Sequence, residues 1–591
     1  MNPALPTFGN ATLTTTDTRA TFALPDWSIE SYRTFLAVKA ALPRVEVDAK
    51  ARTLTCHVAD LARLGVDVRA LAGGLDDDEA PFLYSDQRYV VDVALRRRCF
   101  DIFGRCGFGK SPCLWTFARQ AVKRTGKKVL VVAPKGVVYP LLGEYRKFWP
   151  DAPVPANVME WKGGFEAWVA DSSAPALGIV NIDLFRKPRD LKALGGVVLD
   201  EASKIKQAGG VLWKNVLASF KPVEYVLGCT ATPAPNEERE YAAQALLVRA
   251  VSSHKEFFAD FFDSTEECGW VLRPHARDAY YAFMASWSIW IRDPAVYGFA
   301  PRLKPIPPPV FEDVEVALTP EQERVSRELR AASSRKGQMS LYHEAVGVSL
   351  QQRLSQVARG FLYANETVEG AKGKSKKTRR TLHIPSRKPA AVADIVARHA
   401  LAGERSVVWV QYNEESTLIT QALRARGVKV VEVTAETSDA AQYAAVEDLN
   451  AGRIDALVAK VTALGFGVNL QGASVCVFSG INDSFEQDHQ AFSRVWRDGQ
   501  ENTVHCYYVV TPLEASMLAN VREKRGRWLT DAAEMERAYC AAMRADIDAW
   551  RGAPSPSKHR TRHQLSPADR TALAGLRPYR PIEETIREHA A

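Results

Sequence analysis

Two arginines near the end of the chain have a spacing that suits phosphate chemistry. At roughly 100° per residue, a helix over residues 490–500 places Gln490, Arg494 and Arg497 on one face. The opposite face is apolar and carries Phe492, Val495 and Trp496. Gly499 stands where such a helix is expected to end. Guanidinium groups on a packed helix can stabilise charge on a transferring phosphoryl group, although a charged helix face is more often simply solvated. The chemical interpretation therefore needs a phosphate site elsewhere in the chain.

Residues 104–111 supply a candidate, because GRCGFGKS fits the phosphate-loop pattern GxxxxGK(S/T). The segments before and after it predict a strand and a helix, which is the context that this motif requires. Gly107 and Gly109 would let backbone N–H groups approach the phosphates. Lys110 would reach the outer phosphates, and the Ser111 hydroxyl would bind Mg²⁺. A chance glycine-rich turn is the alternative, and it leaves the flanking elements unexplained.

Two acids, Asp200 and Glu201, follow the short apolar run 197–199. Such a run predicts a strand buried on both faces, and ligands of open α/β sheets bind at the carboxyl ends of such strands. Asp200 would hold Mg²⁺, and Glu201 would orient or deprotonate an attacking water. An isolated Asp-Glu pair often only caps a helix. Beside a phosphate loop, however, the pair completes a site for nucleotide hydrolysis.

The composition is that of an ordinary soluble protein. The 591 residues are 46% hydrophobic and 25% charged, which allows about three or four domains with ample core. Residues 1–13 lack a signal pattern, and no apolar stretch reaches the ~18 residues that span a bilayer. The nine cysteines include no CxxC pair and are expected to be buried thiols. We therefore expect a cytoplasmic protein without a membrane segment.

The net charge of +8, from 77 basic and 69 acidic residues, is unevenly distributed. Residues 372–388 contain no acid and carry eight basic residues: Lys372, Lys374, Lys376, Lys377, Arg379, Arg380, Arg387 and Lys388. Such a block repels itself and suits a phosphate backbone, and the alternative is a solvated flexible loop without a ligand. Residues 551–580 form a second basic stretch, rich in Pro, Ser and His, that predicts a loosely ordered tail.

The predicted elements divide the chain into five parts. These are an accessory module (1–80), a first lobe with the phosphate loop (81–300), a Pro-rich linker with a helical insertion and the basic loop (301–390), a second lobe (391–530) and a helix with a basic tail (531–591). The predicted strands are 12–23, 52–58, 129–133, 177–182, 196–200, 225–230, 407–411, 428–433, 456–459, 475–478 and 504–510. Residues 28–41, 250–300 and 319–362 are expected to be helical. In both lobes strands alternate with helices, which argues for doubly wound parallel sheets.

Taken in order, these segments resemble superfamily 2 helicases, and among them the Swi/Snf-type double-stranded-DNA translocases, especially compact phage and bacterial members. The resemblance covers about residues 81–525. Besides the phosphate loop and Asp200 to Ser203, it is carried by segments 82–87, 133–135, 181–184, 230–236, 464–470 and 490–500. The last of these ends in Arg-Asp-Gly-Gln, which is typical of the Swi/Snf group.

The resemblance implies roles for individual residues. It assigns further nucleotide contacts to Gln87, which would recognise adenine, and to Gly467 and Gln490. It assigns nucleic-acid contact or coupling to Lys135, Ser203, Thr230, Thr232 and Asn469. Ser203 departs from the family, which commonly has histidine there, and this puts coupling through that position in doubt.

The resemblance also implies a fold and an activity. The fold is α/β, with two tandem RecA-like doubly wound parallel-sheet lobes, helical insertions and a small α+β N-terminal module. Mg·ATP would bind the first lobe, and closure would bring Arg497, with Arg494 as its partner, onto the γ-phosphate. Double-stranded DNA lying across both lobes would favour closure, so that an ATP hydrolase translocates along it. We expect a monomer, with a possible protein partner at residues 1–80 or the tail.

Two other functions remain open. One is a superfamily 2 helicase that separates strands of branched DNA or RNA, which a duplex-unwinding assay beside triplex displacement would distinguish. The other is a nucleotide-gated DNA-binding scaffold with little turnover. Biological activity that survives Lys110→Ala would indicate the scaffold.

Overall fold

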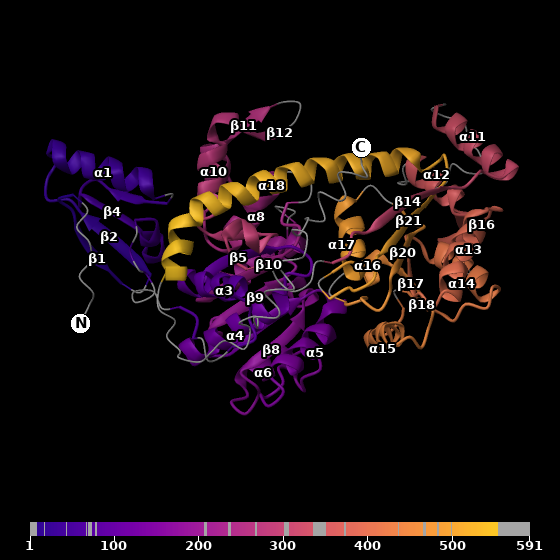
Figure 1. The fold of residues 1–591 in the computed structure, drawn as a ribbon, viewed down its shortest axis with the longest axis horizontal. Coiled ribbons are helices and arrows are strands. Elements are labelled where there is room, and N and C mark those ends of the chain that lie inside the picture. The colour runs from indigo at the N-terminus through magenta and orange to yellow at the C-terminus, as the bar shows by residue number, and fades with distance from the viewer. Residues whose placement is uncertain are drawn as a thin grey trace, which may run out of the picture. The chain divides into compact units, whose positions relative to one another are not determined.

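The computed structural model describes residues 9–16, 18–42, 44–64, 66, 68, 74–76, 80–205, 210–234, 238–265, 269–300, 306–334, 350–370, 374–434, 436–464, 468–481, 484–497 and 499–552. The chain divides into two compact units. Unit 1 comprises Met1–Leu303 and Leu529–Tyr579, and unit 2 comprises Lys304–Trp528 and Arg580–Ala591. Each unit is built on its own parallel sheet (Figure 1).

Unit 1 begins with an antiparallel sheet in the order β1-β2-β4-β3. Its elements are β1 (Thr12–Thr15), β2 (Arg19–Ala23), α1 (Ile29–Ala41), β3 (Glu46–Asp48), β4 (Thr53–His57) and the 3-10 helix η1 (Val58–Leu64). The prediction of one strand over 12–23 is wrong, because the Thr16 amide donates to the Arg19 carbonyl and turns the chain into a hairpin. Phe22 and Leu54 are fully buried in the core of this module.

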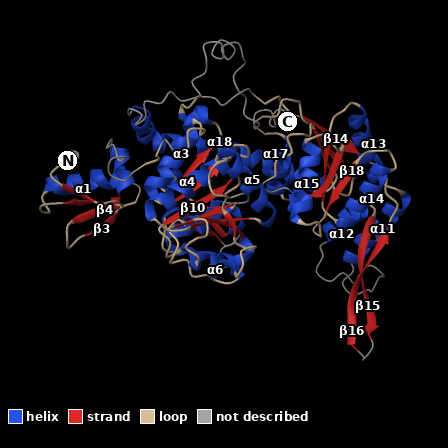
Figure 2. Ribbon diagram, turned by 90° about the horizontal axis from the view of Figure 1, so that it is seen from below, coloured by secondary structure: helices blue, strands red, loops and turns tan. Residues whose placement is uncertain are grey.

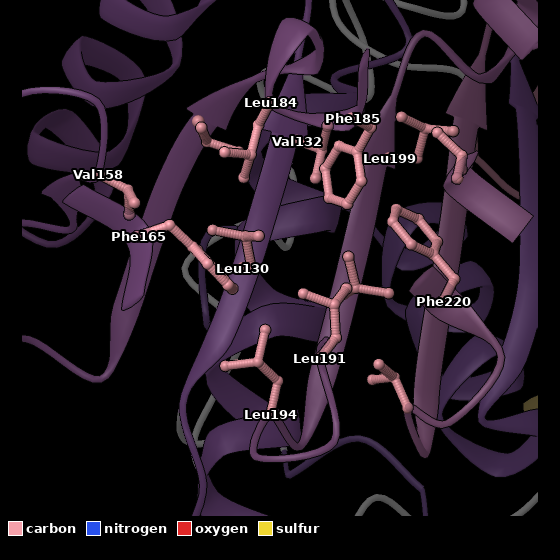
Figure 3. Close-up of a cluster of buried hydrophobic side chains, with 14 of the residues drawn as sticks. Leu130, Val132, Val158, Phe165, Leu184, Phe185, Leu191, Leu194, Leu199 and Phe220 are labelled. Carbon is pink, nitrogen blue, oxygen red and sulfur yellow. The ribbon is translucent and has the colours of Figure 1, made fainter. Parts of the chain in front are cut away.

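The large sheet of unit 1 is parallel throughout and has the order β13-β5-β10-β9-β6-β8-β7. Its strands are β5 (Cys99–Gly104), β6 (Val129–Ala133), β7 (Ala156–Asn157), β8 (Leu177–Asn181), β9 (Gly196–Asp200), β10 (Tyr225–Thr230) and β13 (Ser288–Ile291). The strands β6, β8, β9 and β10 were predicted, and their apolar runs are buried on both faces. Figure 3 shows how side chains such as Leu130, Leu199 and Phe220 gather against this sheet.

Helices connect the strands of this sheet. They are α3 (Ser85–Arg97), α4 (Lys110–Thr125), α5 (Val138–Phe148), α6 (Gly164–Ala170), α7 (Val211–Phe220), α8 (Tyr241–Leu247), α9 (His254–Phe261) and α10 (Arg277–Met284), with 3-10 turns η3 (Lys135–Val137), η4 (Ile182–Arg186), η5 (Ala202–Ile205), η6 (Glu238–Glu240), η7 (Pro274–Ala276) and η8 (Pro294–Tyr297). The segment 250–300 is not all helical as predicted. It also contains the hairpin β11 (Phe262–Thr265) and β12 (Gly269–Leu272), and the sheet strand β13.

Unit 2 has a six-stranded parallel sheet in the order β14-β21-β20-β17-β19-β18. Its strands are β14 (Val310–Glu315), β17 (Ser406–Val410), β18 (Val430–Val433), β19 (Ala456–Lys460), β20 (Val475–Phe478) and β21 (His505–Val510). Its helices are α11 (Pro320–Ser334), α12 (Leu350–Ala358), α13 (Lys388–Leu401), α14 (Asn413–Arg424), α15 (Asp439–Asn450), α16 (Val461–Leu464) and α17 (Phe485–Val495). Two parallel α/β sheets in one chain confirm the predicted fold class.

The basic block forms an element that the sequence did not predict. Strands β15 (Phe361–Gly370) and β16 (Lys374–His383) pair antiparallel as one long hairpin, with Phe361 opposite His383. Figure 2 shows the two strands extending away from the helices of unit 2. The prediction of a loop here, and of helix up to residue 362, is therefore wrong, because cross-strand pairing satisfies the backbone of the basic segment.

The helix α18 (Ala515–Gly552) is 38 residues long, and its last part belongs to unit 1. There Asp546 accepts hydrogen bonds from Arg96 and Tyr89, all at 3.0 Å. Tyr539 and Ser288 share a hydrogen bond of 2.8 Å between their hydroxyl oxygens. Buried polar contacts thus attach this part of α18 beside strand β13. No helix in the described part of the chain is long and apolar enough to cross a membrane.

Candidate nucleotide site

The phosphate loop has the backbone that its glycines predict. Strand β5 ends at Gly104, and α4 begins at Lys110. Gly107 and Gly109 have φ angles of 82° and 78°, a left-handed region that strains other residues. A Cβ on Gly104 would lie 2.8 Å from the buried Phe108 ring. The loop is therefore held by packing beneath it. The first turn of α4 contains no acid that would repel an anion.

Two side chains close the loop by hydrogen bonds to its backbone. Lys110 Nζ donates to the carbonyls of Gly104 at 2.9 Å and Arg105 at 3.2 Å. Gln87 Nε2 donates to the carbonyl of Phe108 at 2.9 Å, and the Tyr84 amide donates to Gln87 Oε1 at 3.0 Å. Gln87 is buried, with 3% of its surface exposed, and both of its polar ends contact backbone. Its predicted role in reading adenine stays a prediction, and the structure adds a role in bracing the loop.

The acids of the site lie where β9 ends. Glu201 has a φ of 58° and is buried. Its Oε1 accepts hydrogen bonds from Thr230 Oγ1 at 2.5 Å and from Ser203 Oγ at 2.8 Å. The Thr232 amide in turn donates to Thr230 Oγ1 at 3.2 Å. One carboxylate therefore joins the segment after β9 to the segment after β10, and Ser203 keeps a polar link at the position where the family commonly has histidine.

Strand β10 separates the two halves of the site, because it pairs with β5 on one side and β9 on the other. Asp200 lies opposite Cys229 in this register. Burial raises the pKa of the Cys229 thiol well above its usual range, the charge of Asp200 raises it further, and that of Lys110 lowers it. Lys110 and Asp200 therefore both act on the carboxyl end of β10. The Ser111 hydroxyl and the Asp200 carboxylate are hard oxygen donors of the kind that fit Mg²⁺.

Lys135 follows β6 at the same carboxyl edge of the sheet and is exposed. The carboxyl ends of neighbouring parallel strands thus carry the loop, the acids, the Thr230 segment and an exposed cation. The contact of Lys135 with nucleic acid stays a prediction.

The motif helix of unit 2 differs from its prediction. Helix α17 ends at Val495, and Trp496 leaves the helix with φ −92° and ψ 95°. Arg497 therefore does not share a helical face with Arg494, and Gly499 (φ 95°) lies beyond the helix end. The physical reason is Trp496, whose Nε1 donates to the Pro307 carbonyl at 2.8 Å. The predicted apolar face is confirmed, since Phe492, Val495 and Trp496 are all buried.

The other predicted residues of unit 2 occupy different environments. Gln490 is fully buried, whereas Arg494 and Arg497 are partly exposed. The Arg494 carbonyl accepts a hydrogen bond from the Leu470 amide at 3.1 Å, which ties the helix end to the neighbouring motif. Asn469 Nδ2 donates to Gln471 Oε1 at 2.7 Å. Gly467 lies outside the described residues.

The basic block is not uniform. Lys374, Lys376 and Lys377 lie on β16, and Lys372 lies outside the described residues. Lys388 does not belong with them, because it is buried and its Nζ donates to both carboxylate oxygens of Glu514, at 2.9 and 2.7 Å. No sequence signal indicates this pair, since its members are 126 residues apart.

Parts of this chain are similar in sequence to known proteins. Residues 387–499 match the family described as Helicase conserved C-terminal domain. The chain is 29% identical over 116 residues to the DNA repair and recombination protein RAD54B of Gallus gallus, covering 19% of this chain and 13% of that protein. It is 27% identical over 126 residues to Helicase SWR1 of Mycosarcoma maydis, covering 21% of this chain and 7% of that protein. The chain thus spans a small part of the length of both relatives. Residues 387–499 therefore belong to this helicase family.

Solved structures similar to this chain include the Sulfolobus solfataricus SWI2/SNF2 ATPase core in complex with dsDNA, with a TM-score of 0.33, 18% identity, and coverage of 78% of this chain and 92% of that one. For the S. solfataricus core domain alone, the TM-score is 0.32 at 18% identity, with 72% and 84% coverage. The family match and the curated relatives confirm the predicted resemblance to superfamily 2 helicases of the Swi/Snf type.

Proposed function

We propose that this Swi/Snf-like protein hydrolyses Mg·ATP and uses each cycle to move along double-stranded DNA. The observation that carries the proposal is the position of Glu201. Its carboxylate lies after the strand that ends in Asp200, and two hydroxyl groups hold it. A fixed, buried carboxylate at the edge of a phosphate-loop sheet suits the orientation of a water for attack on phosphorus.

The residues of unit 1 would divide the chemistry. Lys110 would leave the loop carbonyls and bind the β- and γ-phosphates, while backbone N–H groups at the start of α4 bind the remaining oxygens. Ser111 and Asp200 would hold Mg²⁺, which when bound neutralises charge that develops on the phosphates. Glu201 would accept a hydrogen bond from the attacking water and take its proton.

Unit 2 would supply the cations that complete the site. Arg497 would contact the γ-phosphate, with Arg494 beside it, once the two units close on the nucleotide. An arginine finger contributes roughly 10³–10⁵ in rate, or about 4–7 kcal/mol of barrier. Hydrolysis would therefore be slow until closure, and anything that favours closure would speed it.

Thr230 would link this chemistry to movement. It contacts Glu201 through its hydroxyl, and its own oxygen receives the amide of Thr232 two residues along. A change in the protonation or position of Glu201 would therefore alter the segment after β10. Duplex DNA would bind the closed form more tightly than the open form and would thereby raise the fraction of closed protein. Turnover would increase by at most that difference in affinity.

DNA contact is proposed for Lys135, Asn469 and the lysines of β16. Such cations bind the phosphate backbone without reading bases, which predicts little sequence preference and strong salt dependence. The same feature supports a second candidate function. A long hairpin with a basic strand is also an element that can separate strands, so an unwinding helicase remains the alternative.

The test is steady-state ATP turnover with duplex, forked and single-stranded DNA and RNA, combined with two strand assays. A translocase on duplex DNA is stimulated most by duplex and displaces a third strand without opening the duplex. Stimulation mainly by forks or single strands, with opening of the duplex, would favour the unwinding helicase. A protein that turns over ATP no faster with any nucleic acid would contradict both.

A further inference from the structure

A basic cavity lies within unit 1 where the N-terminal module meets the amino end of the large sheet. It has a volume of about 300 Å³ and is lined by Arg44 and His57 of the module and by Arg97, Arg98, Glu224 and Arg249 of the lobe. Arg98 precedes β5 directly, and Glu224 precedes β10. The phosphate loop follows the carboxyl end of β5, whereas the cavity lies at its amino end. The cavity is therefore separate from the nucleotide site.

The cavity holds more positive than negative charge. Arg97 forms an ion pair of 2.7 Å with the fully buried Asp60, and Arg98 forms one of 2.6 Å with Glu224. Arg44 and Arg249 contact carbonyl groups instead. Arg44 Nη2 donates to the Arg249 carbonyl at 3.2 Å, and Arg249 Nη2 donates to the Phe220 carbonyl at 3.0 Å. Neither forms an ion pair with a carboxylate among the residues that the structure describes.

The titration behaviour of the lining agrees with this excess. Burial lowers the pKa of His57 to about 3, and the charges of Arg97, Arg44 and Arg98 contribute to the shift, although Asp60 opposes it. Burial also lowers the pKa of Arg44, with Asp60 and Glu256 acting against the shift. His57 is therefore neutral at physiological pH, chiefly because it is buried.

The backbone of two lining arginines is also unusual. Arg98 and Arg249 have φ angles of 62° and 59°, a region that residues other than glycine rarely adopt. Glu201 of the nucleotide site shares this property, with a φ of 58°. Such conformations persist where the surroundings hold them, and they are concentrated at binding and catalytic sites.

We propose that this cavity binds a small phosphate-bearing anion, with Arg44 and Arg249 as its main ligands. Guanidinium groups match phosphate oxygens in geometry and charge. The volume is at the lower end of the range for ligand pockets, which admits a phosphate with a small organic group and excludes a duplex. Because Arg44 comes from the module and Arg249 from the lobe, the bound anion would join the two and stabilise their contact.

The test uses the full chain carrying Lys110→Ala, so that the phosphate loop contributes little to phosphate binding. Calorimetric titration with inorganic phosphate, pyrophosphate and adenosine monophosphate measures affinity, and thermal unfolding measures stabilisation. Arg44→Gln and Arg249→Gln are added singly to this background, because removal of one charge-assisted hydrogen bond weakens binding by roughly 10- to 100-fold. Arg33→Gln, on the exposed side of α1 in the same module, is the matched control.

The proposal expects binding with a raised unfolding temperature in the Lys110→Ala protein, unchanged affinity with Arg33→Gln, and the stated loss of affinity with either cavity variant. Absence of binding, or equal affinity in all variants, would overturn it. Binding only of DNA bearing a terminal phosphate, with none of the three small anions, would also overturn it. Arg249 is exposed, so its variant is expected to fold even if Arg44→Gln does not.

Discussion

Glu201 has two hydroxyl partners and a left-handed backbone, and the partner that connects it to the rest of the sheet is Thr230. The hydroxyl is 2.5 Å from Glu201 Oε1, and both residues are buried. A carboxylate that orients water needs such a fixed position, because general acid–base catalysis contributes roughly 10²–10⁴ in rate only when the geometry is correct. We therefore expect the proposed chemistry to depend on this contact as well as on the acid itself.

Thr230→Val removes the hydroxyl and keeps the shape. We expect ATP turnover to fall roughly 10- to 100-fold, while affinity for a fluorescent ATP analogue stays close to that of the wild type. Thr420→Val is the matched control, because Thr420 is also buried but its hydroxyl has no hydrogen-bond partner within the described part of the chain. Equal turnover in both variants would show that Thr230 does not position Glu201.

At the scale of elements, we expect the stability of α18 to change with the protonation of Glu536. Glu536 is buried and accepts hydrogen bonds from the amides of Arg292 at 2.6 Å and Asp293 at 2.8 Å. Burial raises its pKa from 4.5 to about 7. Because the folded-state pKa lies above the unfolded value, the protonated acid stabilises the folded state. That stability is complete below pH 4.5 and is lost as the pH rises to about 7.

We therefore expect residues 532–547 of α18 to lose protection against hydrogen exchange between pH 5 and 7.5. After correction for intrinsic exchange rates, the decrease in protection should be roughly 2 kcal/mol. Glu536→Gln should flatten this dependence, whereas Glu534→Gln, at a half-buried neighbour on the same helix that pairs with Arg277, should retain it. A pH dependence that survives Glu536→Gln would assign the effect to another group.

A second prediction at the scale of elements concerns the hairpin β15–β16. If its lysines contact DNA phosphates, replacing Lys374, Lys376 and Lys377 by Gln should weaken binding at every sequence alike. The slope of log affinity against log salt should become shallower by ~0.9 for each phosphate that the variant no longer neutralises. Gln at the exposed Lys187, Lys192 and Lys221 removes the same charge from another surface and serves as control. An unchanged slope in the hairpin variant would remove β16 from the DNA site.

The sequence predicted elements well where one physical signal decides the structure. Strands β6, β9, β10 and β20 are apolar runs buried on both faces, so their bounds follow closely from composition. Prediction failed where the structure depends on a contact between residues that are far apart in the sequence. The end of α17 depends on the bond from Trp496 to Pro307, which is 189 residues away. The conformation of the basic segment depends on pairing with β15, which no local pattern in 372–388 reveals.

The same contrast between local signals and contacts of distant residues applies to the candidate nucleotide site. The loop at 104–111 and the acids after β9 could be identified, because glycine spacing and strand ends have direct chemical meaning. The hydroxyl partners of Glu201 could be placed near it only by motif resemblance, and the bonds themselves come from the strand order β5-β10-β9. The bracing of the loop by Gln87 could not be foreseen, because its backbone partner is 21 residues away.

At the scale of the whole molecule, the residues proposed for catalysis are divided between the two units. Unit 1 carries the phosphate loop and Glu201, and unit 2 carries Arg494 and Arg497. In the proposed function, each half alone would lack part of the chemistry that phosphoryl transfer requires. Hydrolysis should therefore depend on both units together, and DNA should act by favouring their association with one nucleotide.

The most direct test is ATP turnover with and without duplex DNA for the wild type, Arg497→Ala and Arg424→Ala. Arg424 is an exposed arginine of unit 2 and controls for loss of one positive charge. We expect DNA to stimulate the wild type and Arg424→Ala alike, while Arg497→Ala binds ATP but loses roughly 10³-fold or more of the stimulated rate. Normal DNA-stimulated turnover by an Arg497→Ala protein that binds ATP would contradict the account.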